Sequence, residues 1–158
     1  MMMNDDLREL YQEVILDHSR RPRNRGQLGE GAVHVHGDNP SCGDELDLWV
    51  AFSADDRIED VKFSGQGCAI SQASASMMTA RIKGRAASEA ARVAGEVHEM
   101  LTSATAAPPV DLGELQLLGG VRQFPQRVKC AALGWRALEE ALRLHAARLA
   151  EGQTTTEE

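Results

Sequence analysis

The chain has 158 residues and a formal net charge of −7 at pH 7, a length that favours a single domain of ordinary size. Its 42% apolar and 26% charged residues exclude a mainly disordered chain, and it lacks the run of about 18 apolar residues that a membrane span requires. The acidic balance argues against nonspecific binding to nucleic acid, which needs basic surface. The opening residues do not resemble a secretory signal, and three cysteines, an odd number, argue against a disulfide framework. We therefore expect a cytoplasmic protein.

The first predicted element is a helix from about residue 5 to His18 or Ser19. Its apolar residues recur at threes and fours: Leu7, Leu10, Tyr11, Val14 and Ile15. We interpret His18, at the end of this pattern, as a surface or dipole-compensating residue. A basic island with arginines at positions 20, 21, 23 and 25 follows. This island is either a solvated loop or a docking patch for an acidic partner.

A strand-rich region follows, in which apolar and polar residues alternate with period two. The alternation is present in 33–36, is clearest in 45–52, and resumes in 58–64 after a turn at 54–57. The runs 45–52 and 58–64 are joined by the short polar turn at 54–57, so we expect them to form a hairpin. We predict a small antiparallel sheet of about three strands.

Helical periodicity returns after Gly65-Gln66-Gly67 and predicts helices over about 70–83, 88–101 and 125–149. The first is rich in Ser and Ala, which favours close packing, and 102–123 reads as a connector with at most short helical turns. Since the strands and helices are segregated along the chain, we predict the α+β class with helices packed on one face of the sheet. We expect one domain over 1–150 and a flexible polar tail over 151–158.

Three cysteines, far apart in the sequence, carry the most chemical information. Cys42 lies in the turn Asn39-Pro40-Ser41-Cys42-Gly43-Asp44, just before a predicted strand. Cys68 follows Gly65-Gln66-Gly67 at the predicted start of a helix, and Cys130 lies early in the last helix. Helix N-termini favour the thiolate, which is both the nucleophile and the metal ligand.

Asp44 adds a carboxylate to this set of thiols. Residues i and i+2 of an extended segment point to the same side, so Cys42 and Asp44 can reach one ion. Three thiolates and one carboxylate complete the tetrahedral shell that Zn²⁺ prefers. Arg127 and Lys129, which precede Cys130 in the sequence, would offset the excess negative charge. Buried structural cysteines and a purely structural zinc are the alternatives.

Several segments resemble the NifU/IscU-like family of iron–sulfur cluster assembly proteins. The similar segments include the amino-terminal run from Leu10 to His18 with Arg21-Pro22-Arg23-Asn24, the two cysteine motifs at 39–44 and 63–76, and Cys130. The resemblance extends over about residues 7–145. Lys129 stands where scaffold members of the IscU type carry a His, and this trait, with the longer connector, is similar to the SufU branch.

The resemblance implies a SufE/NifU-like fold and a zinc site formed by Cys42, Asp44, Cys68 and Cys130. It implies that Cys42 accepts persulfide sulfur from a SufS-type cysteine desulfurase, with Arg127 matching an arginine of the family's third cysteine motif. A downstream Suf cluster assembly scaffold would receive the sulfur. We expect neither a nucleic acid nor a membrane to be a partner of this chain.

Two other functions remain open. The chain could be a scaffold for a [2Fe–2S] cluster or iron, because thiolates suit both metals, although a cationic Lys129 is a poor ligand. It could also be a binding module with a structural zinc and no exchangeable cysteine.

Overall fold

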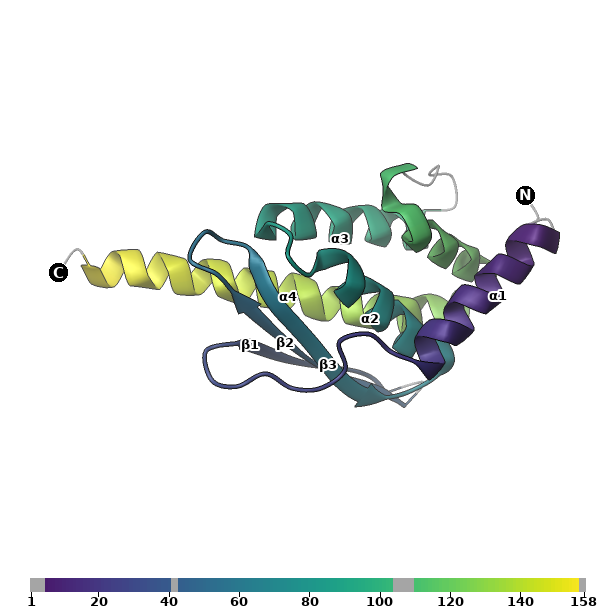
Figure 1. The fold of residues 1–158 in the computed structure, drawn as a ribbon, viewed down its shortest axis with the longest axis horizontal. Coiled ribbons are helices and arrows are strands. Elements are labelled where there is room, and N and C mark those ends of the chain that lie inside the picture. Colours follow the sequence, from purple (N-terminus) through teal and green to yellow (C-terminus); the bar gives the residue numbers. More distant parts are fainter. Residues whose placement is uncertain (1–4, 41–42, 104–109, 157–158) are drawn as a thin grey trace.

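The computed structural model describes residues 5–40, 43–103 and 110–156 (Figure 1). The elements follow in the order α1 (Asp5–Arg20), β1 (Val33–Asn39), β2 (Asp44–Phe52), β3 (Ile58–Gln66), α2 (Ala69–Ile82), α3 (Ala87–Thr102), η1 (Val110–Gln123) and α4 (Pro125–Thr156). The three strands are consecutive and the helices other than α1 come after them. This arrangement confirms the predicted α+β class.

The sheet is antiparallel with the order β1-β2-β3, as predicted. Leu48 on the central strand pairs with Val35 on one side and with Phe63 on the other. All three side chains are buried, because alternate residues of a strand point to the same face. One face of the sheet therefore forms the floor of the core.

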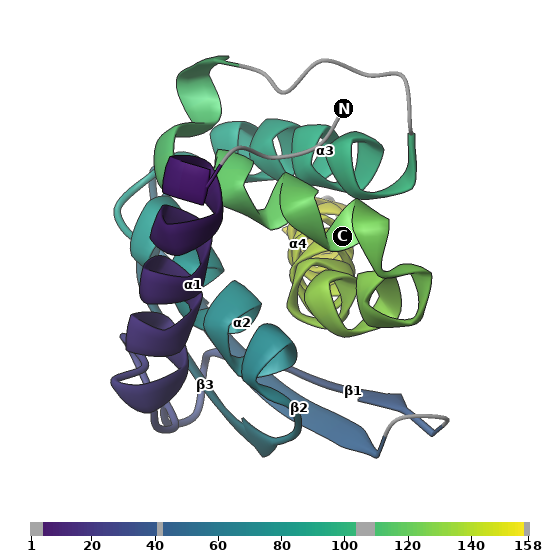
Figure 2. The ribbon, with the colours of Figure 1, turned by 90° about the vertical axis from the view of Figure 1, so that its right-hand side faces the viewer.

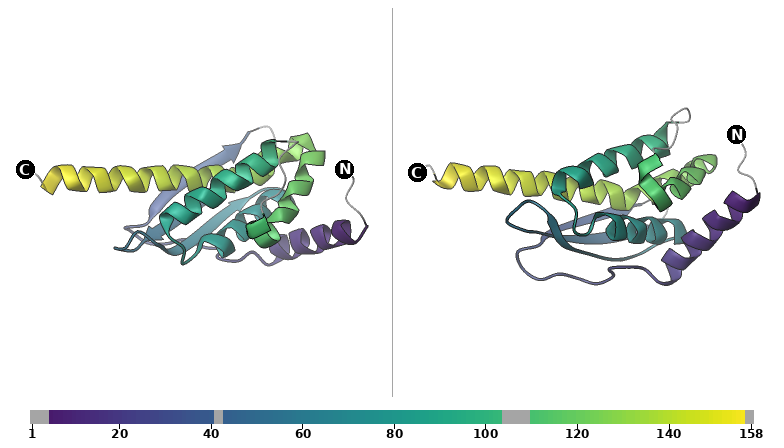
Figure 3. Two further views of the ribbon diagram at one scale, coloured as in Figure 1. Left: turned by 90° about the horizontal axis from the view of Figure 1, so that it is seen from above. Right: turned by 45° about the horizontal axis from the view of Figure 1, so that its top comes forward.

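The helices cover that one face, which confirms the predicted layer arrangement (Figure 2). α4 packs on β1 and β2, and α2 packs on β3. α3 and η1 pack against α4 on the side away from the sheet, while α1 lies against α2. The far end of α4 projects beyond the sheet (Figure 3). None of the described helices combines the length and the apolar character that a membrane crossing requires.

The contact between α2 and α4 is close, as the small residues of α2 predict. A Cβ atom added at Gly134 would lie 3.3 Å from Cα of Ala75. The indole Nε1 of Trp135 donates a hydrogen bond to Oγ of Ser74 (3.1 Å), and this hydroxyl donates to the carbonyl of Ala131 (2.6 Å). These contacts fix the two helices side by side near their N-terminal ends, where Cys68 and Cys130 lie.

Two features differ from the sequence expectations. The connector contains η1, whose leucines at 112, 115 and 118 are buried and whose helical path breaks at Gly113 (φ 57°). His18 is only 5% exposed, so the expectation of a surface residue was wrong. Its Nδ1 lies 2.8 Å from Oγ of Ser76 and its Nε2 lies 2.7 Å from Glu114. His18 thus joins α1, α2 and η1.

Candidate metal centre

The turn between β1 and β2 forms one side of the candidate site. Asn39 and Asp44 are partners in the sheet register, and the N–H of Gly43 donates to the carbonyl of Asn39 (2.9 Å). Gly43 has φ +75°, a left-handed conformation that glycine adopts without strain. The buried amide of Asn39 donates to the carbonyl of Lys129 (3.0 Å), which ties this turn to α4. Cys42 lies outside the described residues.

Cys68 lies at the N-terminus of α2, as predicted, and adopts the extended conformation of an N-cap residue. Its backbone N–H donates to Oδ1 of Asp44 (2.9 Å), and the hydroxyl of Ser71 lies 3.4 Å from the same oxygen. A Cβ atom at Gly67 would come within 2.3 Å of Oδ1 of Asp44. The glycine before Cys68 therefore leaves the space that the carboxylate occupies.

Cys130 completes the described part of the site from α4. Its side chain is fully buried, one turn into the helix that begins at Pro125. A carboxylate oxygen of Asp44 and the sulfurs of Cys68 and Cys130 all lie within 4.8 Å of one another. The structure thus brings together three of the four predicted ligands, although they come from positions 44, 68 and 130.

The second carboxylate oxygen of Asp44 indicates what this group of side chains is suited to hold. Asp44 is only 1% exposed, and its Oδ2 has no hydrogen-bond partner among the described residues. A buried carboxylate oxygen without a partner is unfavourable, and a metal ion would compensate it. Two thiols and one carboxylate are ligands that zinc accepts. The described residues therefore fit a divalent metal ion such as zinc.

Arg127 supplies positive charge beside the sulfurs. It is exposed on the first turn of α4. A hydrogen bond to the side chain of Cys130, together with electrostatic attraction to the side chains of Cys68 and Cys130, raises the pKa of the Arg127 guanidinium. The predicted charge compensation near Cys130 is therefore present for Arg127. Its predicted catalytic role stays a prediction.

Arg25 holds the segment that carries Cys68, a role for which the sequence carries no signal. Its Nη2 donates to the carbonyl of Gly65 (2.9 Å) and its Nη1 donates to Oε1 of Gln72 (3.0 Å), so it bridges the two sides of Cys68. The guanidinium also lies 5.9 Å from the ring centre of Phe63. No local pattern could reveal this bridge, because the partners are 40 and 47 positions away.

The rest of the basic island is on the surface. Arg23 forms a 2.7 Å ion pair with Asp17, and the hydrogen bond from Arg23 lowers the pKa of that carboxyl. Arg20 and Arg21 are exposed. The island therefore combines internal contacts with exposed charge, and its role as a docking patch stays a prediction.

Comparisons with known proteins agree with this geometry. Residues 10–151 match the family described as NifU-like N terminal domain. The chain is 46% identical to the iron-sulfur cluster assembly scaffold protein IscU of Streptococcus pyogenes serotype M1, over 87% of this chain and 85% of the relative. It is 43% identical to the zinc-dependent sulfurtransferase SufU of Bacillus subtilis strain 168, over 90% of this chain and 95% of the relative.

A solved structure shows the same fold. The putative iron-sulfur cluster assembly scaffold protein for the SUF system from Fervidobacterium islandicum AW-1 superposes with a TM-score of 0.78 at 36% identity, covering 85% of this chain and 97% of that chain. The identities and the coverage confirm the resemblance that the cysteine motifs indicate. This chain belongs to the family of NifU-like N-terminal domains.

Proposed function

We propose that this chain works in iron–sulfur cluster assembly as a zinc-dependent sulfur acceptor, which takes persulfide sulfur from a cysteine desulfurase on Cys42. Two observations carry the proposal together: ligand atoms of Asp44, Cys68 and Cys130 lie within 4.8 Å of one another, and the buried Oδ2 of Asp44 has no hydrogen-bond partner in the described part of the chain. The family of the chain and its similarity to a zinc-dependent sulfurtransferase support it.

Cys42, Asp44, Cys68 and Cys130 are the residues that we propose as zinc ligands. Cys42 is two positions from Asp44, and two residues span at most about 7 Å of chain, so its thiol stays within reach of the group. Zinc, when bound, keeps thiols ionised at neutral pH. The acceptor should be the most accessible of the thiols, and Cys130 is fully buried, which argues against it in that role.

The transfer step is an exchange between sulfur atoms. The Cys42 thiolate attacks the outer sulfur of the desulfurase persulfide, and a new sulfur–sulfur bond forms on Cys42. The sulfur–sulfur bond of the desulfurase breaks, and its cysteine leaves as a thiolate. The cysteine of one protein is oxidised as that of the other is reduced, so no further oxidant is needed. Arg127, beside the Cys130 sulfur, is placed to attract the negatively charged persulfide.

A desulfurase assay tests the proposed function. We expect the zinc-loaded protein to raise the rate at which a pyridoxal-phosphate cysteine desulfurase produces alanine from cysteine, because removal of the persulfide frees the enzyme for the next turnover. Protein stripped of zinc should stimulate the enzyme much less. An unchanged rate with zinc-loaded protein at several concentrations would contradict the proposal.

A cluster scaffold is the second candidate, favoured by the 46% identity to a protein named as a scaffold. Lys129, directly before Cys130, argues against a scaffold function, since a cationic amine does not ligate iron. Purification in air distinguishes the two: a colourless protein with about one zinc supports the acceptor, and a brown protein supports the scaffold. A purely structural zinc would leave all thiols closed to alkylation, with or without the desulfurase.

A further inference from the structure

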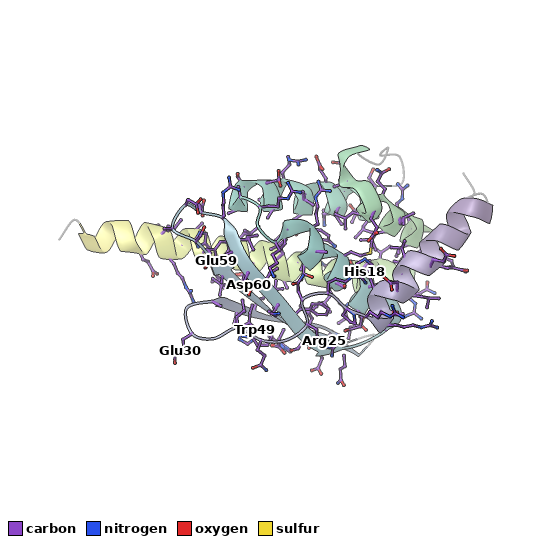
Figure 4. The ribbon with its side chains drawn as sticks, viewed as in Figure 1. His18, Arg25, Glu30, Trp49, Glu59 and Asp60 are labelled. Atoms are coloured by element: carbon purple, nitrogen blue, oxygen red, sulfur yellow. The ribbon has the colours of Figure 1, made fainter. Side chains whose placement is uncertain are left out.

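The outer face of the sheet, away from the helices, carries a cluster of imidazole and carboxylate groups. His34 and His36 on β1 are opposite Trp49 and Asp47 on β2. Their neighbours Val35 and Leu48 point into the core, so the alternation of the strands directs these four side chains outward. Figure 4 shows Trp49 on this face, on the side of the sheet away from α2 and α3.

Both imidazole rings are directed at the same carboxylate oxygen. Nε2 of His34 lies 2.8 Å and Nδ1 of His36 lies 3.1 Å from Oδ1 of Asp47. The His34 ring is stacked on Trp49, with ring centres 4.7 Å apart and planes 9° from parallel. The side chains of His34 and His36 are 49% and 51% exposed. Both ring nitrogens thus lie within hydrogen-bond distance of one carboxylate oxygen, at a place that solvent can reach.

The donor types and their spacing suit a transition metal ion. Residues i and i+2 of a strand share a face, so a His-X-His segment presents two imidazoles together. Imidazole and carboxylate are ligands for Zn²⁺, Ni²⁺ and Cu²⁺. Ligand atoms around such an ion are about 3.4 Å apart, from metal–ligand bonds of about 2.1 Å. The two nitrogen–oxygen distances to Asp47 are already close to this value, but the two nitrogens do not lie within 4.8 Å of each other. Both exposed rings therefore have to turn before they can share one ion.

The charges around the cluster also favour a cation. Partial burial acts to raise the pKa of the Asp47 carboxyl, but the hydrogen bonds from His34 and His36 outweigh it and hold the pKa below its usual value. Asp38 and Glu45, on the next rung of the sheet, are exposed carboxylates. Lys62, opposite Trp49 on β3, is the basic residue of this part of the face. The carboxylates of Asp38, Glu45 and Asp47 therefore outnumber the amine of Lys62 on this part of the face.

This cluster is separate from the candidate zinc site. Asp44 is buried under the helices, whereas Asp47, three positions later, points to the opposite face of β2. We propose that His34, His36 and Asp47 form a second site for a divalent transition metal ion, open to solvent and weaker than the cysteine site. Water completes the coordination of the ion.

Nickel titration of the zinc-loaded protein tests this site. We expect equilibrium dialysis to find about one Ni²⁺ per chain beyond the retained zinc. Each of His34→Gln and His36→Gln should weaken this binding at least about tenfold, since even outer-shell changes cost about 10–100-fold in metal affinity. His98→Gln, an exposed histidine on α3, is the matched control and should change nothing.

Tryptophan fluorescence gives a second readout. Ni²⁺ should quench Trp49, which stacks on a ligand, and spare Trp135, which is buried between α2 and α4. Trp49→Phe should therefore remove the quenching and keep the binding. Equal Ni²⁺ affinity of the wild type and the His34→Gln/His36→Gln double variant, or no bound Ni²⁺ in the wild type, would overturn the proposal. Neither result would affect the proposed sulfur transfer.

Discussion

Cys42→Ser is expected to abolish the stimulation of the cysteine desulfurase, so that the rate falls to that of the desulfurase alone. A serine hydroxyl is not ionised at neutral pH and cannot accept the outer sulfur of a persulfide, whereas a thiolate can. The fold should persist, because Asp44, Cys68 and Cys130 remain and serine is close to cysteine in size. The measurement is alanine production with circular dichroism of the same samples.

A trapping experiment complements this variant. After incubation with desulfurase and cysteine, alkylation and mass spectrometry should locate the persulfide of the wild-type protein on Cys42. A Cys130→Ser variant is the control for the loss of one thiolate, because it weakens the metal site but keeps the proposed acceptor. Stimulation that survives in Cys42→Ser, or a persulfide found on Cys68 or Cys130, would show that the acceptor is assigned wrongly.

The second large effect is expected for Asp44→Asn, with opposite signs in the two metal states. Without zinc, Asp44 is a buried carboxylate whose Oδ2 lacks a partner within the described ranges. Such a group costs about 1–3 kcal/mol, and more when charged. Asparagine removes the charge and can still accept the hydrogen bond from the N–H of Cys68. The zinc-free variant should therefore unfold at a higher urea concentration than the zinc-free wild type.

With zinc, the same substitution should weaken the protein's hold on the metal. A neutral amide is a poorer zinc ligand than a carboxylate, so zinc affinity measured against a chelator should fall at least about tenfold. Asp38→Asn, at an exposed carboxylate on the outer face of the sheet, is the control and should alter neither quantity. If Asp44→Asn destabilises the zinc-free protein and leaves zinc affinity unchanged, Asp44 is a cap for α2 and not a ligand.

The local structure followed from the sequence where a single periodicity dominates. The alternation of Leu46, Leu48 and Val50 predicts β2, and all three are buried as expected. The connector was predicted less well, because its buried leucines surround Gly113, whose left-handed φ of 57° interrupts the helical period. A segment that changes path in its middle has no single hydrophobic period, so its sequence pattern does not indicate a helix.

The long-range contacts could not be derived from local patterns. The burial of His18 depends on Ser76 and Glu114, which are 58 and 96 positions away. The convergence of Asp44, Cys68 and Cys130 was inferred from their chemistry and from the family resemblance, because spacing alone does not bring them together. The bridge that Arg25 forms across Cys68 could not be predicted from the sequence, since its partner at Gly65 is a backbone carbonyl, which every residue has.

X-ray absorption at the zinc edge of the purified, metal-replete protein addresses most directly whether the cysteines and Asp44 surround one ion. We predict about one zinc per chain with three sulfur neighbours at about 2.3 Å and one oxygen at about 2.0–2.2 Å. The sulfur count should fall to two in Cys42→Ser. A protein that retains no zinc, or whose zinc has fewer than three sulfur neighbours in the wild type, would contradict this account.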